Sequence, residues 1–556
     1  MISFLGKIWR ERGKFSSEKS LFKNLLDVRN RSEADFTDAT FEKLFDPFLF
    51  CDMERSVSRI QNALEKGEKI LIFGDYDVDG MSGVAQLFLT MKMLGANVSY
   101  RLPRREEGYG LSSHIAEEIK NSGTSLVLTT DCGISNRREI EALQKENIDV
   151  IITDHHSLKE ELPPAYAILH PLLESELFPD KHITGSGVAF FLCYGLLLRV
   201  YGKEKSRRSL EQLLELAVLG TIADCGILQG QNRIITLLGL EHLKNTKNPG
   251  LRSLLDMSKS AADSLNAEQI AFYLAPRLNA AGRLSDPHIS LELLLGNHTR
   301  ALELETLNHR RQDLVEIFLE KAEKMIDGRG QNLPAFLLKS EEWPSGILGL
   351  LAGKICEKYG KPTVVVEVRQ QKMIGSCRGP DDFHFSKALK NVAEENPDLF
   401  LGFGGHAIAA GFSISSEKYS LFESAFLRYV EKSRGTEEIL QHIDFDFSHH
   451  EKIHAEEILE LENCAPFGTG NPNPLFHFPK MKIKNSKACG NGNKHLSLFL
   501  ENQHGQRFSG IFFGQGALLD RLSQDKEIDI LASPEVREWN GERRVQMKIV
   551  DIRGNF

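Results

Sequence analysis

Aspartates and histidines gather where three apolar runs of the sequence end. They are Asp75, Asp77 and Asp79 after KILIFG, Asp131 after LVLTT, and Asp154, His155 and His156 after VIIT. Carboxylate and imidazole ligands together suit Mn²⁺ or Mg²⁺ better than a metal that prefers thiolates. Two such ions about 3.5–4 Å apart can activate a water and stabilise both oxygens of an in-line phosphoryl displacement. The pattern therefore predicts a two-metal site for phosphoryl transfer.

The apolar runs that would carry these side chains alternate with helical stretches. Five runs are rich in β-forming residues: KILIFGD (69–75), NVSYRLP (97–103), SLVLTTDCG (125–133), DVIITDHH (149–156) and AYAILHP (165–171). Their alternation with helices predicts βαβ units and a mostly parallel sheet. The carboxyl ends of such strands meet at the crevice where ligands bind. Gly80 would let a helix begin close to a bound phosphate.

Each of these groups also has a structural explanation. An aspartate directly after a strand is usually a helix N-cap, and paired histidines after an aspartate are more often surface groups than ligands. Capping does not readily explain three such groups at three successive strand ends. We therefore expect a functional cluster.

The composition indicates a globular chain of several domains. Its 556 residues are 41% hydrophobic and 26% charged. The eight cysteines form no Cys-x-x-Cys pair, which argues against a zinc site or disulfides and favours a reducing, cytoplasmic compartment. The N-terminus lacks the features of a signal peptide. Val188 to Val200 is too short to span a bilayer, so we expect a buried helix there and no membrane association. The net charge of −9 argues against broad binding to duplex DNA but allows a local basic groove.

The pattern of apolar residues changes along the chain and predicts five parts. They are an N-terminal extension (1–48), a parallel-sheet α/β domain (49–240), a helical connector (241–330), a second α/β domain (331–435) and a small β-barrel of the OB type (441–556). Thr299 to Asp327 contains neither Gly nor Pro, which predicts one long helix in the connector.

The acidic motifs resemble those of a known superfamily. GDYDVDG, TTDCG and TDHH, in this order, are similar to motifs of the DHH phosphoesterases, and LGTIADCGIL supplies the lone Asp224 of a fourth motif. The resemblance implies two divalent ions, Mn²⁺ or Mg²⁺, with Asp131 as the bridge between them. It implies that His156 contacts substrate or supports a ligand and that Asp154 orients a histidine. The implied ligands are Asp75, Asp77, Asp79, Asp131, His155 and Asp224.

This chain departs from the superfamily pattern at two points. Phe73 stands where many relatives have a histidine, and Cys225-Gly226-Ile227 stands where Val-Val-Pro is common. Neither departure removes a carboxylate. The first could alter the occupancy of one metal site.

Other blocks resemble the RecJ branch of this superfamily, which comprises single-strand-specific DNA exonucleases. They are RLPRREEGYG (101–110), FYLAPRLNAAGRLSDP (272–287), GSCRG (375–379), LGFGGHAIAAGF (401–412) and CAPFGTGNPNPLF (464–476). Arginine forks match phosphate geometry, although solvated arginines at a helix start are an equally good interpretation of 272–287 alone. The implied substrate-binding residues are Arg105, Tyr109, His156, Arg277, Asn279, Arg283, Ser376, Arg378, Gly404, Gly405 and His406.

The resemblance gives several of these residues a more specific role. It places Ser376 and Arg378 near a terminal 5′ phosphate and His406, as a catalytic residue, at the scissile phosphate. It implies that the Tyr109 ring stacks on a base. Arg104 and Arg105 remain alternatives for one position, of which Arg105 is preferred.

The OB-type barrel would bind single strands through a basic groove and stacking aromatics. Lys487, Lys494, His495 and Phe513 are candidates for that role. For any single aromatic in a barrel strand, a place in the core is the better interpretation.

The resemblance implies a single-strand-specific 5′-to-3′ exonuclease that releases 5′ mononucleotides in DNA repair and recombination. We expect a ring-like monomer in which the long helix joins two catalytic lobes and the barrel guides single-stranded DNA. Single-strand-binding protein and a helicase are the implied protein partners. Two alternatives stay open: a phosphodiesterase of short oligonucleotides or cyclic dinucleotides, and a catalytically silent DNA-binding scaffold.

Overall fold

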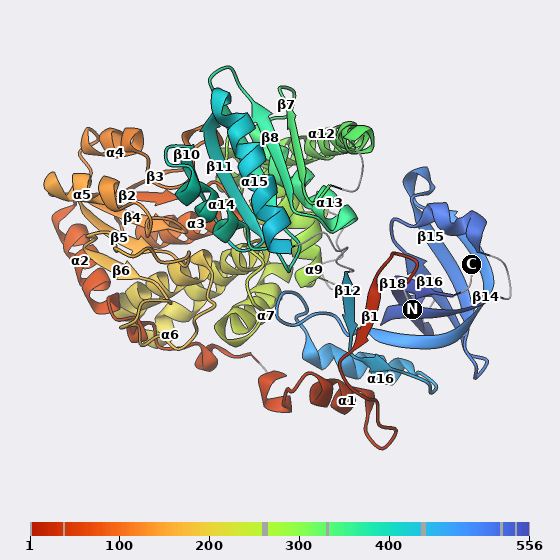
Figure 1. Ribbon diagram of the computed structural model, residues 1–556. Coiled ribbons are helices and arrows are strands. Elements are labelled where there is room, and N and C mark those ends of the chain that lie inside the picture. Colours follow the sequence, from red (N-terminus) through yellow and green to blue (C-terminus); the bar gives the residue numbers. More distant parts are fainter. Residues whose placement is uncertain are drawn as a thin grey trace. The chain divides into compact units, whose positions relative to one another are not determined.

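A computed structural model describes residues 3–36, 39–257, 265–329, 333–434, 441–522, 526–539 and 542–554. The chain forms two compact units. Unit 1 combines Met1–Asp38 with Glu438–Phe556, and unit 2 is Ala39–Glu437. Each unit is described by itself below, and Figure 1 labels its elements.

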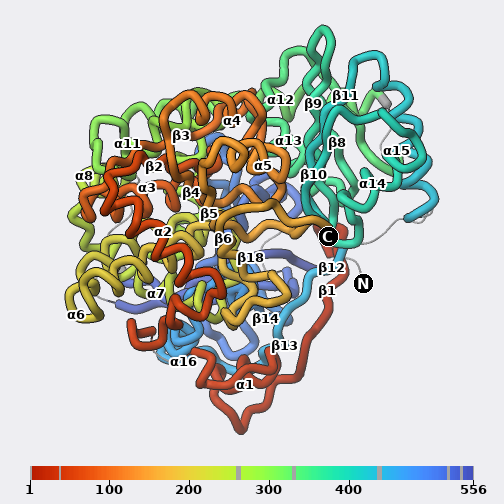
Figure 2. The backbone as a smooth tube through the Cα atoms, turned by 90° about the vertical axis from the view of Figure 1, so that its left-hand side faces the viewer, coloured from red at the N-terminus to blue at the C-terminus, as the bar shows by residue number. Residues whose placement is uncertain are grey.

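The first sheet of unit 2 has five parallel strands in the order β3-β2-β4-β5-β6. Figure 2 shows them in this sequence. The strands are β2 (Lys69–Gly74), β3 (Asn97–Arg101), β4 (Leu126–Thr130), β5 (Asp149–Thr153) and β6 (Ala167–Leu169). The central strands are buried along most of their length, as expected when helices cover both faces of a parallel sheet. The predicted parallel sheet is thus confirmed.

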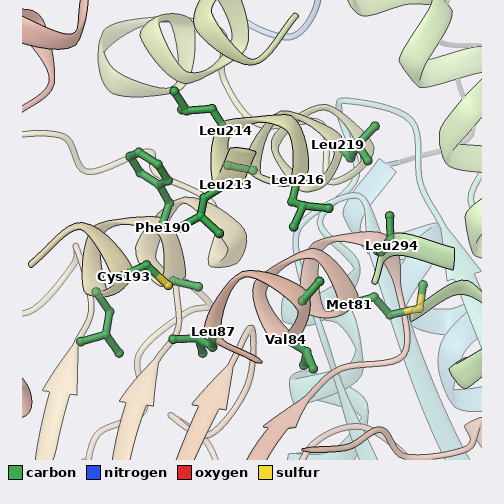
Figure 3. Close-up of a cluster of buried hydrophobic side chains, with 14 of the residues drawn as sticks. Met81, Val84, Leu87, Phe190, Cys193, Leu213, Leu214, Leu216, Leu219 and Leu294 are labelled. Atoms are coloured by element: carbon green, nitrogen blue, oxygen red, sulfur yellow. The ribbon is translucent and has the colours of Figure 1, made fainter. Parts of the chain in front are cut away.

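Alternate residues of these strands face two different cores. Ile70, Ile72 and Leu128 pack with α3 (Val78–Met93) and α6 (Gly185–Ala223). Figure 3 shows part of this core, with Val84 and Leu87 of α3 near Phe190 and Leu213 of α6. Leu71, Phe73 and Val127 pack on the opposite side with α4 (Ser113–Lys120) and α5 (Arg137–Lys145). These two layers fix the strand ends.

Among the described residues, α6 is the one helix that is both long and apolar enough to be a candidate membrane span. Its composition and length would suffice to cross a membrane, but 72% of its most apolar window is buried inside the protein. Gly202, at φ 73°, interrupts its helical backbone. This burial is what a core helix of a folded domain shows, and it agrees with the predicted buried helix over Val188 to Val200.

The remainder of unit 2 before the second sheet is helical, as predicted. It contains α2 (Met53–Lys66), α7 (Gly230–Lys244), α8 (Pro249–Met257), α9 (Ala267–Gln269), the π-helical turn η6 (Ile270–Leu274), α10 (Ala275–Leu284), α11 (His288–Leu294) and α12 (Arg300–Arg329). The predicted long connector helix corresponds to α12.

The second sheet has the order β10-β11-β9-β8-β7 and is antiparallel except for the pair β7–β8. Helices α14 (Phe385–Glu395) and α15 (Tyr419–Arg434) share one core with it, while α12 and α13 (Ser345–Tyr359) share the other. The strand β10, within the Gly-rich motif, was not predicted because glycines give no β signal. The strands are β7 (Phe336–Ser340), β8 (Thr363–Val368), β9 (Lys372–Arg378), β10 (Phe400–Gly405) and β11 (Ala409–Ser415).

Unit 1 contains a closed five-stranded barrel in the order β14-β15-β16-β18-β17, since β14 pairs with both β15 and β17. This confirms the predicted OB-type barrel. The short strand β13 (Phe447–Ser448) adds to β14, and α16 (Ala455–Leu461) packs on the barrel. The barrel strands are β14 (Phe476–Cys489), β15 (His495–Glu501), β16 (Arg507–Phe512), β17 (Glu527–Trp539) and β18 (Glu542–Arg553).

The predicted N-terminal extension (1–48) belongs to this barrel unit as far as Asp38. Strand β1 (Ile8–Glu11) pairs with β12 (His442–Phe445), and α1 (Leu21–Val28) packs into the barrel's core. The Trp9 indole donates to Asp551 at 2.9 Å, and Arg29 forms two bonds of 2.9 Å to Asp446. Partners more than 400 residues away in the chain give no local sequence signal.

Candidate active site

The ends of strands β2, β4 and β5 bring the predicted acids and histidines together. The Nε2 atom of His155 lies 3.1 Å from Asp131 Oδ1, 3.6 Å from Asp224 Oδ2 and 3.7 Å from Asp79 Oδ2. Asp224 reaches the cluster from the C-terminal end of α6. Four separate segments of the chain therefore meet at one point, as the arrangement of a parallel sheet requires.

Backbone amides fix two of the acids after β2. Asp77 is the N-cap of α3 and accepts from the amides of Asp79 and Gly80 at 3.0 and 3.1 Å. The carboxylate of Asp79 accepts from the first amides of α6, those of Gly185 and Ser186, at 2.8 and 3.0 Å. Asp79 thus joins the starts of two helices.

Gly185 is a part of the site that the sequence did not single out. A Cβ atom there would lie 2.7 Å from Asp131 Cβ and 2.8 Å from Asp79 Oδ2. Glycine at this position therefore lets α6 begin directly against the acids. The segment TGSGVA contained that signal, because small residues at a helix start permit close approach.

Asp131 holds an unusual backbone conformation. Its φ is 59°, which is uncommon for a residue other than glycine. Its amide donates to Thr153 O and its carbonyl accepts from the Tyr109 hydroxyl, both at 2.9 Å. These two bonds hold the peptide and direct the carboxylate into the cluster.

Asp154 orients the histidine pair. Its carboxylate accepts from the amides of Ile134, His155 and His156 and lies 2.8 Å from His156 Nδ1. Burial alone would raise the pKa of Asp154, but the hydrogen bonds from His156 and from the Ile134 amide hold it well below its usual value. His156 is correspondingly favoured as a cation, with its pKa raised to about 9 by Asp154 against the effect of burial.

His170, at the end of β6, is a further member of this network. It is fully buried, and its Nε2 lies 2.8 Å from the carbonyl of His156. The sequence placed His170 at the end of a predicted strand, and that position was the available signal.

The donor set fits divalent cations. Asp75 Oδ1 is buried and has no hydrogen-bond partner among the described residues. Burial raises the pKa of Asp75, and the negative charge of Asp77 raises it further. Burial and the charge of Asp79 raise the pKa of Asp131 in the same way. Cations of high charge would relieve this repulsion. Three groups have ligand atoms within 4.8 Å of one another: Asp75, Asp77 and Asp131; Asp79, His155 and Asp224; and Asp131, His155 and His156. The first two share no residue.

The first two groups together contain all six residues implied as metal ligands. Phe73 is fully buried in the core beneath α4 and α5 and contributes no ligand. Cys225, with φ 55°, follows Asp224. A pocket of about 220 Å³ opens beside His155 and Asp224, with Lys181 and His182 in its lining.

The predicted arginines of the first lobe have different surroundings. Arg105 stacks over the Tyr76 ring at 4.4 Å and donates to Gly282 O at 3.1 Å, whereas Arg104 pairs with Asp286. Arg105 is also one of the charges that act on Asp75.

The three predicted residues of α10 are also distinguished by their partners. Arg277 is held by Glu305 of α12, with bonds of 2.5 and 3.0 Å. Asn279 accepts from the amide of Val78 at 3.2 Å and so supports the start of α3. Arg283 donates to the carbonyl of Gly346 in α13 at 3.1 Å.

The second α/β lobe places His406 beside the first lobe's histidines. The rings of His406 and His156 are stacked with centroids 5.7 Å apart. Gly404 and Gly405 lie on the exposed strand β10, and an added Cβ at Gly405 would lie 2.4 Å from Ala410 Cα. On β9, Arg378 Nη1 lies 3.4 Å from Ser376 Oγ.

The barrel of unit 1 carries exposed aromatic and basic side chains. Phe513 is 52% exposed and packs edge-on against His495. Lys487 and Lys494 are exposed. Phe499, 42% exposed on β15, is an aromatic that the sequence did not single out, because its alternation with core residues predicts only an outward direction.

Comparison with known proteins agrees with this geometry. The DHH family, N-terminal domain, matches residues 69–221, the DHHA1 domain matches 332–432 and the RecJ OB domain matches 443–551. The single-stranded-DNA-specific exonuclease RecJ of Escherichia coli is 32% identical over 527 residues, which are 90% of this chain and 90% of that protein. The RecJ of Bacillus subtilis is also 32% identical, over 92% of this chain but only 64% of its own length.

Solved structures give the same relationship. The RecJ of Thermus thermophilus in complex with Mn²⁺ has a TM-score of 0.79 and 28% identity, covering 99% of this chain and 80% of that one. An exonuclease RecJ bound to manganese has a TM-score of 0.61 and 32% identity, covering 71% of this chain and 98% of that one. The motifs, the converging metal ligands and these relatives lead to one conclusion: the chain belongs to the RecJ family of single-stranded-DNA-specific exonucleases.

Proposed function

We propose that this chain hydrolyses single-stranded DNA from its 5′ end and releases 5′ mononucleotides. Its place in the family makes it a metal-dependent nuclease. The observation that carries the proposal is the pair of ligand groups at the strand ends, with the charge of Arg105 acting on them. The activity of relatives supports the choice of single-stranded DNA as substrate.

The divalent cofactors, Mn²⁺ or Mg²⁺, would be held by the two ligand groups. Asp75, Asp77 and Asp131 would bind one ion, and Asp79, His155 and Asp224 the other. Bound there, the ions supply water activation and charge neutralisation for phosphodiester hydrolysis. The bond of His155 to Asp131 at 3.1 Å places the two groups side by side, which supports Asp131 as the shared ligand.

His156 and His406 are the proposed contacts of the scissile phosphate. Because Asp154 engages Nδ1 of His156, Nε2 is the remaining polar atom of the ring for a phosphate oxygen. His406 lies against the same ring from the second lobe. Gly404 and Gly405 leave room for the strand at this point, since a Cβ at Gly404 would meet no atom within 4 Å.

The 5′ polarity follows from a phosphate pocket next to the metal ligands. Arg105 acts electrostatically on Asp75, and Ser376 and Arg378 come from the second lobe. A terminal phosphate held there would leave the next phosphodiester bond at the metal centre, so cleavage would release one nucleotide. Tyr109 is 43% exposed, and its ring face is available for a base.

Selectivity for single strands is assigned to the two lobes and the barrel. A strand that must pass between His156 and His406 cannot carry a paired complement through the same space. Phe499, Phe513 and Lys487 offer stacking and charge on the barrel. A role in cytoplasmic DNA repair and recombination, a monomeric state, and work with single-strand-binding protein and a helicase are proposals that rest on the family alone.

A substrate comparison tests the proposal. The protein with Mn²⁺ or Mg²⁺ is given a long single strand, the same sequence as a blunt duplex, and a dinucleotide. We expect rapid degradation of the single strand and little of the duplex. Equal degradation of duplex and single strand would refute the selectivity. Cleavage of the dinucleotide with the long strand left intact would make the chain a small-substrate phosphodiesterase instead.

A further inference from the structure

The helices α10 and α12 pack against each other and carry one ion pair and two further arginines. At one position Arg277 of α10 is neutralised by Glu305 of α12. Arg283 and Arg311 each lie six residues further along their helices. Arg311 is one of the charges that act on Arg283, and the neighbourhood of these two arginines is called the second position.

The arginines at this second position have no acidic partner among the residues that the structure describes. Arg283 donates to Gly346 O, and Arg311 donates to Asn308 Oδ1 at 2.9 Å. The Nε atom of Arg311 is buried and makes no hydrogen bond to any described residue. A buried, unpaired donor of a charged group is costly, so an anion that accepts from Arg311 Nε would be stabilising there.

The guanidinium groups of Arg105 and Arg378 also act on Arg283. Burial, and then repulsion from Arg105, Arg311 and Arg378, lowers the pKa of Arg283 to about 9. Burial also lowers the pKa of Arg311 and of Arg378. The four arginines come from the first lobe, α10, the connector helix α12 and the second lobe's sheet. Such a concentration of like charge is unfavourable until an anion occupies it.

We propose that Arg311 is a fourth ligand of the 5′-phosphate pocket, and that a phosphate bound by these four arginines ties the two lobes of unit 2 together through the connector helix. The inference deepens the proposed function and rests on it. A terminal phosphate has about two negative charges and three acceptor oxygens, which suit several guanidinium forks at once. The unpaired Nε–H group of Arg311 would donate a hydrogen bond to one of those oxygens.

The adjacent glycines of α13 support this arrangement. A Cβ at Gly346 would lie 1.9 Å from the carbonyl of Arg283, and one at Gly349 would lie 2.9 Å from Arg378 Nη2. The helix α13 is therefore packed directly against two of the arginines. An anion at this point contacts residues of both lobes, so its binding would be felt in the stability of the whole unit.

The first test measures thermal unfolding of the full chain in a chelator, with and without inorganic phosphate, for wild type, Arg311→Met and Arg378→Gln. Arg310→Met is the matched control, because Arg310 is the exposed neighbour on the same helix. We expect phosphate to raise the midpoint of wild type and of the control. We expect Arg311→Met to be at least as stable as wild type without phosphate, because repulsion is removed, and to lose the phosphate-induced rise.

If Arg311 has a purely structural role, the opposite results are expected for Arg311→Met. Arg311→Met would then lower the midpoint and leave the phosphate-induced rise unchanged, which would overturn the inference. Arg311→Lys keeps the charge but not the fork. It should retain only part of the rise.

The second test compares 5′-phosphorylated and 5′-hydroxyl oligonucleotides. We expect Arg311→Met to raise KM about tenfold for the phosphorylated strand alone, with kcat little changed. If Arg378→Gln loses the preference for phosphate and Arg311→Met keeps it, the inference on Arg311 fails while the proposed function stands. If neither variant alters the preference, the 5′-phosphate pocket itself is wrong.

Discussion

Two regions of this protein bury ionisable groups that have no partner among the described residues, and they differ in what surrounds those groups. In unit 2, Asp75 Oδ1 has no hydrogen-bond partner among the described residues. It lies among other carboxylates, so negative charge accumulates there. In the barrel of unit 1, His449 Nδ1 also lacks a partner; it lies against Phe15 and near Phe478, and His450 and His504 act on it. The carboxylates are stable as anions only with a counter-ion, whereas histidines can lose their protons and stay as neutral rings. A buried unpaired carboxylate among other carboxylates therefore indicates a cation site, and a buried unpaired histidine does not.

The comparison predicts the largest effect for Asp131. Asp131→Asn should reduce hydrolysis of a single-stranded oligonucleotide by about a thousandfold or more, because it removes the shared ligand of both groups. In a chelator the variant should be no less stable than wild type, since it removes a repelling charge. Its stabilisation by Mn²⁺ should be much smaller. Rates and unfolding midpoints measure both effects, and Glu146→Gln, on the exposed end of α5, is the control.

The metal-free acid cluster should respond to pH in a definite direction. Burial and Asp79 raise the pKa of Asp224 to about 8, above the value of an unfolded carboxyl. The folded form thus holds a proton that the unfolded form releases, so stability present at low pH is lost as the pH rises towards 8. Unfolding in a chelator across this range should show the decline, and Asp224→Asn should flatten it. A midpoint that rises with pH would contradict the cluster's electrostatics.

His449 of the barrel unit should respond in the opposite direction. Burial, and then repulsion from His450 and His504, lowers the pKa of His449 to about 4, below the ordinary value of 6.5. Between these values the unfolded chain binds a proton that the folded chain refuses, so stability falls as the pH falls from 6.5 to 4. The loss should approach about 3 kcal/mol in denaturant unfolding of unit 1, followed in the full chain. His449→Phe should remove this dependence, and an unchanged slope in that variant would show that another group is responsible.

The smallest predicted effect concerns Tyr109, whose hydroxyl bonds to a residue of the acid cluster. Tyr109→Phe keeps the ring but removes the hydroxyl that bonds the Asp131 carbonyl and lies 3.0 Å from His156 Nδ1. We expect kcat to fall about tenfold with little change in KM. Tyr109→Ala, which also removes the ring, should raise KM as well. Wild-type kinetics for Tyr109→Phe would show that the hydroxyl does not position the site.

Sequence patterns were sufficient to predict the parts of this fold that depend on local periodicity. The parallel sheet, the long helix α12 and the convergence of acids at β2, β4 and β5 follow from strand-end positions and helical periodicity. Partners far apart in the chain were not predictable in this way. Gly185 against Asp131, Arg311 beside Arg283 and Trp9 on Asp551 depend on tertiary packing, for which one sequence carries no local signal.

Residue type alone was also insufficient to separate the arginines. Arg277 and Arg283 occupy the same motif, yet Glu305 neutralises the first while the second has no acidic partner among the described residues. Glu305 lies on α12, 28 residues after Arg277 in the chain. The structure therefore distinguishes an arginine with an acidic partner from one without, where the motif treats them alike.

The most direct test of the central claim is product analysis on single-stranded oligonucleotides labelled at either end, with Mn²⁺ or Mg²⁺, for wild type and Asp131→Asn. We predict that wild type releases the 5′ label first, as a mononucleotide, and that the variant releases almost none. Early release of the 3′ label, or equal release by the variant, would contradict the account.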